Sequence, residues 1–98
     1  MTDPEPSALH AIVEGRVQGV GFRANVANVA QSLGLKGWVR NLGDDRVEVW
    51  AEGPQTELDK LLAYLYRGPS MAFVSGVQVD RPAPSGKFRQ FMVVSSSW

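Results

Sequence analysis

A glycine-rich segment near the N-terminus has the composition of a phosphate-binding loop. It runs from Gly15 to Arg23 and reads Gly-Arg-Val-Gln-Gly-Val-Gly-Phe-Arg. Because glycine adopts positive φ angles without steric cost, consecutive backbone N–H groups in such a segment can turn toward one anion. A helix that begins directly after the loop adds unpaired N–H groups and the positive end of its dipole. A glycine-rich surface turn is the alternative interpretation at this point.

Arg23 ends the segment and falls in the first turn of the helix expected after it. A cation at that position opposes the helix dipole by about 0.3–1 kcal/mol. An anion held between the guanidinium group and the helix N-terminus would account for the placement, whereas a solvated surface arginine would not need one. The segment therefore indicates a phosphate cradle with an arginine beside it.

The rest of the composition limits the chemistry that is available. The 98 residues form one small domain that is 44% hydrophobic, and ten basic residues balance ten acidic ones, which argues against a nucleic-acid or membrane partner. The chain has no cysteine and one histidine, His10, so no Ser-His-Asp set, Cys-His pair or metal cluster can be assembled. Met1–Ser7 lacks the basic and apolar runs of a secretory signal, and we expect a cytoplasmic protein.

A phosphate cradle, an arginine and neutral polar groups can accelerate only a reaction whose leaving group departs easily. Acyl phosphates qualify, because their leaving group is a carboxylate that needs no strong acid. Asn41 is the polar residue that the fold could bring close, since it stands at the end of an expected strand. Its carboxamide can donate and accept, so it could hold a water in line with phosphorus. The alternative is an asparagine that caps a strand before a turn.

The hydrophobic periodicity predicts an α+β domain with the element order β-α-β-β-α-β and a short added C-terminal strand. We expect a ferredoxin-like sandwich, in which two helices cover one face of an antiparallel sheet. Gly53-Pro54 should start the second helix, with proline at its first position, and the region 82–86 should form a turn. The expected strands are Leu9–Glu14, Leu35–Asn41, Arg46–Glu52, Phe73–Arg81 and Phe91–Val94, and the expected helices begin at Arg23 and after Gly53.

The central hairpin can be aligned by its charges. With Asp44 at the centre of the turn, Trp38 lies opposite Trp50, Arg40 opposite Glu48 and Lys36 opposite Glu52. One face then carries an aromatic pair between two pairs of opposite charge, each worth about 0.2–1 kcal/mol. A shift by one residue would bury the charges, so the register is strongly specified.

Three segments with the right mutual spacing resemble the acylphosphatase family. They are Gly15–Arg23, the stretch Leu-Gly-Leu-Lys-Gly-Trp-Val-Arg-Asn at 33–41, and Val47-Glu48-Val49 leading to Gly53, and the resemblance extends from Leu9 to Val94. It implies a metal-free hydrolase of the carboxyl–phosphate anhydride bond that needs no cofactor and forms no phosphoenzyme. Asp45 departs from the family, which usually has glycine in this turn, and aspartate tolerates positive φ less well.

The resemblance also implies roles for individual residues. The arginine that matches Arg23 binds the phosphoryl group, and the asparagine that matches Asn41 positions the attacking water. The expected partners are a small acyl phosphate as substrate and inorganic phosphate as product and inhibitor, and we expect a monomer. We place a flexible tail at 1–7, one domain at 8–94 and a short tail at 95–98. The backbone N–H groups expected to bind phosphate are those of Arg16, Val17, Gln18, Gly19, Val20, Gly21 and Phe22.

Parts of the sequence also fit three other functions. The stretch from Gly19 to Ala24 fits G-x-G-x-x-A, but the hairpin that follows is not the βαβ unit of a dinucleotide fold. An RNA-recognition domain shares the element order, but 46–52 lacks its aromatic motif and the net charge is zero. A regulatory domain that binds phosphate or carbamoyl phosphate without turnover stays open as the alternative function.

Overall fold

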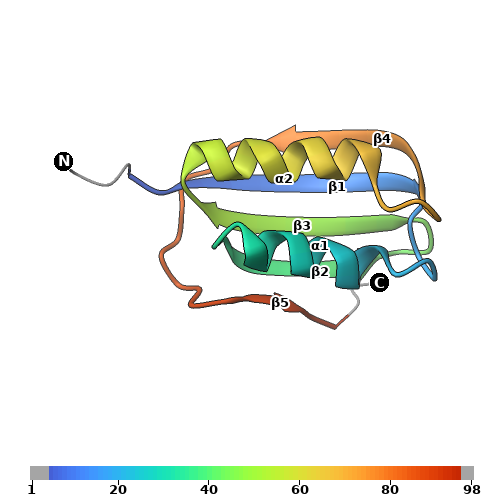
Figure 1. Ribbon diagram of the computed structural model, residues 1–98, viewed down its shortest axis with the longest axis horizontal. Coiled ribbons are helices and arrows are strands. Elements are labelled where there is room, and N and C mark those ends of the chain that lie inside the picture. Colours follow the sequence, from blue (N-terminus) through green and yellow to red (C-terminus); the bar gives the residue numbers. More distant parts are fainter. Residues whose placement is uncertain (1–4, 96–98) are drawn as a thin grey trace.

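The structure, a computed structural model, describes residues 5–95 and has the expected element order (Figure 1). Of the tails predicted at 1–7 and 95–98, residues 1–4 and 96–98 lie outside the described part of the chain. No helix within residues 5–95 is long and apolar enough to cross a membrane. The elements are β1 (Ser7–Arg16), α1 (Phe22–Ser32), β2 (Lys36–Leu42), β3 (Arg46–Gly53), α2 (Gln55–Arg67), β4 (Phe73–Asp80) and β5 (Phe91–Val93).

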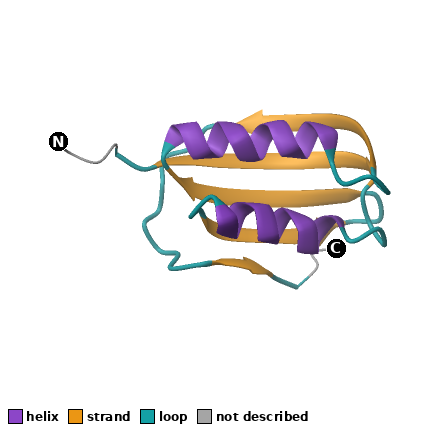
Figure 2. Ribbon diagram, viewed as in Figure 1, coloured by secondary structure: helices purple, strands orange, loops and turns teal. Residues whose placement is uncertain are grey.

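The strands form one sheet in the order β4-β1-β3-β2-β5, and both helices lie on the same face of it (Figure 2). The ferredoxin-like α+β fold is therefore confirmed. The four long strands pair antiparallel, as expected, whereas β5 pairs parallel to β2 and makes the sheet mixed. The last two strands lie at opposite edges of the sheet, so the segment between them is a crossover and not only a turn.

Two helix starts differ from the prediction by one residue. α1 begins at Phe22, directly after Gly21, so Arg23 does lie in its first turn. Pro54 is the N-cap of α2 and not its first helical residue, because its extended ψ of 140° places it outside the helix. Its carbonyl oxygen accepts a hydrogen bond of 3.0 Å from Leu58 N–H, which closes the first helical turn.

The predicted hairpin register is confirmed at all three pairs, but only one of the two charge pairs forms. Arg40 and Glu48 meet at 2.7 Å, and His10 Nε2 lies 2.7 Å from the other oxygen of Glu48. Burial alone would raise the pKa of Glu48, but hydrogen bonds with His10 and Arg40 lower it. Lys36 lies opposite Glu52 without an ion pair, because that carboxylate binds elsewhere.

Glu52 is the anchor of the crossover from β4 to β5. Its side chain accepts hydrogen bonds from Trp50 Nε1 at 2.7 Å, Ser85 Oγ at 2.7 Å, and the backbone N–H groups of Ser85 and Gly86 at 3.0 and 2.9 Å. Glu52 is the one charged residue that is buried in the described part of the chain. Burial by itself would raise its pKa, but these four donors lower the pKa to about 2.

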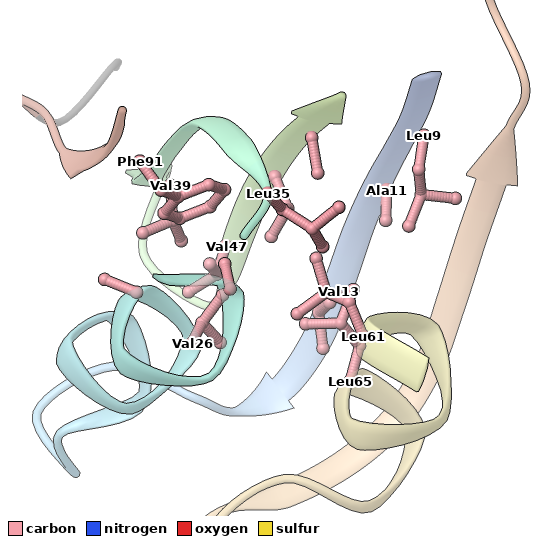
Figure 3. Packing of buried hydrophobic residues seen from close by; sticks show 14 of the residues in the cluster. Leu9, Ala11, Val13, Val26, Leu35, Val39, Val47, Leu61, Leu65 and Phe91 are labelled. Atoms are coloured by element: carbon pink, nitrogen blue, oxygen red, sulfur yellow. The ribbon is translucent and has the colours of Figure 1, made fainter. Parts of the chain in front are cut away.

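The core lies between the helices and the sheet (Figure 3). Leu58, Leu61 and Leu65 of α2 are fully buried, which confirms three of the four leucines in the predicted stripe, and Leu62 packs at its margin. Phe91 of β5 is 2% exposed and packs beside Val39 of β2. This packing fixes the ends of α1 and β5, where the candidate site lies.

The turn between β2 and β3 avoids the expected difficulty at Asp45. Leu42 pairs with Arg46, so Asp44 is central, as the register required. The left-handed residue of this turn is Gly43, with a φ of 67°, and no residue other than glycine has a positive φ in the described chain. Asp45 therefore needs no strained backbone, because Gly43 supplies the conformation that aspartate disfavours.

Candidate active site

The loop between β1 and α1 is fixed by apolar side chains and shaped by two glycines. Val17 and Phe22 are each 1% exposed, and Val20 packs against the core. Gly19 and Gly21, with φ angles of 74° and 76°, occupy the left-handed region that lets the backbone reverse between these anchors. The glycine-rich segment is thus a turn whose two ends are anchored in the core.

From Val17 onward, its backbone N–H groups have no partner in the described residues. None of the N–H groups of residues 17–24 donates to another group in the described chain, and Asn25 N–H makes the first helical bond, 3.0 Å to Gly21 O. α1 has neither a capping side chain nor an acidic residue in its first turn. Unpaired N–H groups and an uncompensated positive dipole end form a site that attracts an anion.

Arg23 stands beside these N–H groups without a counter-charge. Its side chain is half-buried and forms no ion pair and no hydrogen bond with residues 5–95. It lines a cleft of about 190 Å³ together with the loop glycines, Ala24 and Val93 of β5. An arginine held against a helix N-terminus is favourable when an anion lies between them, because both then attract the same charge.

Gln18 has a role that the sequence did not reveal. Its Nε2 donates hydrogen bonds of 2.9 Å to the carbonyl oxygens of Gly43 and Arg46, which belong to the β2–β3 turn and its margin. Gly15 N–H also donates to Asp45 O at 3.2 Å. Hydrogen bonds from Gln18 and from Gly15 therefore join the candidate phosphate-binding loop to the β2–β3 turn. A glutamine in a glycine-rich loop carries no sequence signal for this contact.

Asn41 lies on β2, two residues before Gly43, and is half-buried. It is not among the residues that line the cleft of Arg23. Because Gln18 of the loop contacts Gly43, the two residues lie toward the same end of the sheet but do not line one cavity. Its Oδ1 is buried and has no hydrogen-bond partner in the described chain. A buried amide oxygen without a partner costs about 1–3 kcal/mol, which disfavours the interpretation that Asn41 caps the strand.

Two larger hollows lie away from the loop. One of about 280 Å³ is lined by Lys36, Glu52 and Phe88, and one of about 360 Å³ by His10, Trp50 and Asp80. Neither contains a residue of the loop or of the first turn of α1. His10 contacts Glu48 and the ring of Trp50, which is a structural role. No three metal-ligating side chains gather anywhere in residues 5–95.

Comparisons with known proteins identify the family of this chain. The sequence model of the acylphosphatase family matches residues 9–93. An acylphosphatase of Methylococcus capsulatus is 51% identical, and the match covers 88% of this chain and 94% of that protein. An acylphosphatase of Acaryochloris marina is 50% identical, and the match covers 93% of this chain and 97% of that protein. The crystal structure of acylphosphatase from Bacillus subtilis superimposes with a TM-score of 0.85 at 36% identity, covering 90% of this chain and 98% of that one.

The fold and the matched sequences define a hydrolase built on a ferredoxin-like sandwich. The chain belongs to the acylphosphatase family, as its three spaced segments predicted. Family membership implies a small acyl phosphate as the substrate class.

Proposed function

We propose that the chain hydrolyses acyl phosphates without a metal ion, by direct attack of water on phosphorus. The observation that carries the proposal is the run of N–H groups at 17–24 without a partner in the described chain, together with the cleft that Gly19, Gly21 and Arg23 line. These groups and the guanidinium would bind the phosphoryl oxygens, with Arg16 to Phe22 as the cradle. The same donors would stabilise the charge on those oxygens in the transition state.

Asn41 would position the water. Its carboxamide makes no hydrogen bond within the described chain, and rotation about χ2 can turn either its donor or its acceptor outward. Water oxygen would form the new bond to phosphorus while the bond from phosphorus to the acyl oxygen breaks. The electron pair of that bond leaves with the carboxylate, and the proton of the water passes to phosphate or solvent. No covalent enzyme intermediate is needed.

The alternative is a domain that binds phosphate or carbamoyl phosphate without turnover, because the loop could hold either anion. The names of the relatives that match most of this chain favour the enzyme, since they are acylphosphatases. The cytoplasmic location and the monomeric state stay predictions.

The test is hydrolysis of benzoyl phosphate by the wild-type protein and by Arg23→Gln, with and without a chelator. We expect full wild-type activity in chelator and loss of about 10²-fold or more in kcat/KM for Arg23→Gln. Arg23→Lys should restore little, because a point charge cannot bind two phosphate oxygens in parallel. Arg89→Gln, an exposed arginine on the crossover, is the control and should remain fully active. Near wild-type kcat/KM in Arg23→Gln would exclude the proposed cradle.

A further inference from the structure

One wall of the cleft comes from outside the loop and α1. Among the lining residues, Val93 is the one contributed by a distant part of the chain. The others belong to the loop or to the first turn of α1, whose groups we have assigned to the phosphoryl end of the substrate. Val93 therefore lines the same cleft as the groups proposed to bind the phosphoryl end, from a different part of the chain.

The backbone fixes the direction of this side chain. Side chains alternate between the two faces of a strand, so Val93 points to the same face as Phe91, which is buried against the helices. Met92 between them points to the opposite face. Val93 pairs with Val39 of β2, and Val94 N–H donates to Val39 O at 3.0 Å. Figure 1 shows β5 beside β2, along the side of the sheet that α1 covers.

A second contact ties β5 to the helix that carries Arg23. Gln31 Nε2, near the end of α1, donates a hydrogen bond of 2.9 Å to Phe91 O. Val93 is thus held in position relative to α1, although 43% of its surface is exposed. An exposed valine at the end of a strand usually reflects no function, but this one is part of a cleft whose other wall is a candidate anion site.

The chemistry of the cleft outside the phosphate cradle is apolar. Outside the loop, the side chains that line the cleft are those of Ala24, Val93 and Arg23. Arg23 is assigned to the phosphoryl group, so the apolar side chains of Ala24 and Val93 remain for the rest of the substrate. We propose that Val93 contacts the acyl group of the substrate and makes the enzyme favour acyl phosphates with an apolar aryl or branched acyl group over small ones. The inference rests on the proposed function and adds the residue that distinguishes between its substrates.

The experiment compares kcat/KM for benzoyl phosphate and acetyl phosphate in two variants that should change the ratio in opposite directions. Val93→Ala removes two methyl groups from a half-exposed contact and should lower the benzoyl-to-acetyl ratio about three- to fivefold. Val93→Phe extends the apolar wall and should raise the ratio. Inorganic phosphate has no acyl group, so its inhibition constant should stay within about twofold in both variants.

Met92→Ala is the matched control, because it also shortens an exposed apolar side chain of β5, 49% exposed, but on the other face. It should leave the ratio unchanged. The inference is overturned if Val93→Ala leaves the ratio as Met92→Ala does, or if the phosphate inhibition constant rises in step with KM for benzoyl phosphate. A wild-type protein that hydrolyses neither compound would overturn the proposed function itself, and this inference with it.

Discussion

The side-chain Nε2 of Gln18 lies 2.9 Å from the carbonyl oxygen of Gly43. This hydrogen bond joins the glycine-rich loop to the turn that follows β2, and a second one from the same nitrogen to Arg46 O doubles the connection. Asn41 is two residues from Gly43, so the loop that is proposed to hold phosphorus and the strand that is proposed to hold water are mechanically linked. Gln18 supplies two of the three hydrogen bonds described here between the loop region and the turn, and Gly15 N–H supplies the third.

Gln18→Ala should therefore lower kcat more than it weakens phosphate binding. Loss of the two hydrogen bonds lets the turn move relative to the loop, and small misplacements of reacting groups are costly. We expect kcat for benzoyl phosphate to fall by about tenfold, with a phosphate inhibition constant that changes much less. Gln55→Ala, an exposed glutamine at the start of α2, is the control. Unchanged kcat in Gln18→Ala would show that turnover does not depend on the hydrogen bonds between Gln18 and the turn.

Asn41→Ala should separate binding from chemistry. Water placement matters only in the chemical step, while the loop N–H groups and Arg23 still hold the phosphoryl group. We expect kcat to fall by about 10²-fold or more and the phosphate inhibition constant to move little. Because Oδ1 of Asn41 has no partner in residues 5–95, its removal should not lower the melting temperature.

Asn28→Ala is the control for Asn41, since Asn28 is an exposed asparagine on α1. Its kinetics should match the wild-type values. Full turnover in a folded Asn41→Ala protein would remove this residue from the mechanism. Equal losses in phosphate affinity and in kcat would make Asn41 a binding residue instead.

Inorganic phosphate should inhibit competitively and should raise the melting temperature, because its site exists only in the folded protein. At a phosphate concentration 100 times the dissociation constant, the stabilisation is about 2.7 kcal/mol. Arg23→Gln should lose most of this shift when unfolding is followed by calorimetry with and without phosphate.

Magnesium should leave the activity unchanged. Inhibition by a chelator that added metal reverses would contradict the metal-free mechanism.

The sequence predicted the elements and the hairpin register because these depend on local periodicity and on pairs of opposed charges. Arg40 and Glu48 meet as their positions required, and Gly21 is the N-cap of α1 where the loop ends. Local pattern was also enough to indicate Arg23, since a cation in a first helical turn after glycines is unusual. Amide chemistry and a strand-end position made Asn41 a candidate too, but they did not distinguish a functional side chain from a capping one. Family resemblance added the expected role of positioning water.

Long-range contacts could not be read from the sequence. Lys36 was the evident partner of Glu52, yet the carboxylate binds Ser85 and Gly86, more than thirty residues away. Backbone N–H groups of a crossover have no signature in residue types, and they compete well with an exposed lysine because they lose little entropy on binding. The position of Val93 in the cleft depends in turn on this crossover and on parallel pairing at the sheet edge.

Glu52 should make the stability of the protein depend on pH in the acid range. Its pKa of about 2 in the folded protein lies below the ordinary value of 4.5, because four donors stabilise the carboxylate despite its burial. A carboxyl group with a depressed folded pKa contributes stability that is complete above its unfolded pKa. That contribution should be lost as the pH falls from 4.5 toward 2.

Glu52→Gln removes the charge but keeps the shape, so it tests this account directly. At pH 7 we expect the free energy of unfolding in urea to fall by about 2 kcal/mol, the scale of a hydrogen bond to a charged group. The difference in unfolding free energy from wild type should shrink steadily below pH 4.5. The reason is that the wild-type protein then loses the stability contributed by its carboxylate, whereas glutamine does not titrate. Glu57→Gln, whose partner is the exposed Lys60, should differ from wild type by less than about 0.5 kcal/mol at every pH. A Glu52→Gln protein whose deficit is the same at pH 7 and pH 3 would show that its loss is one of packing and not of charge.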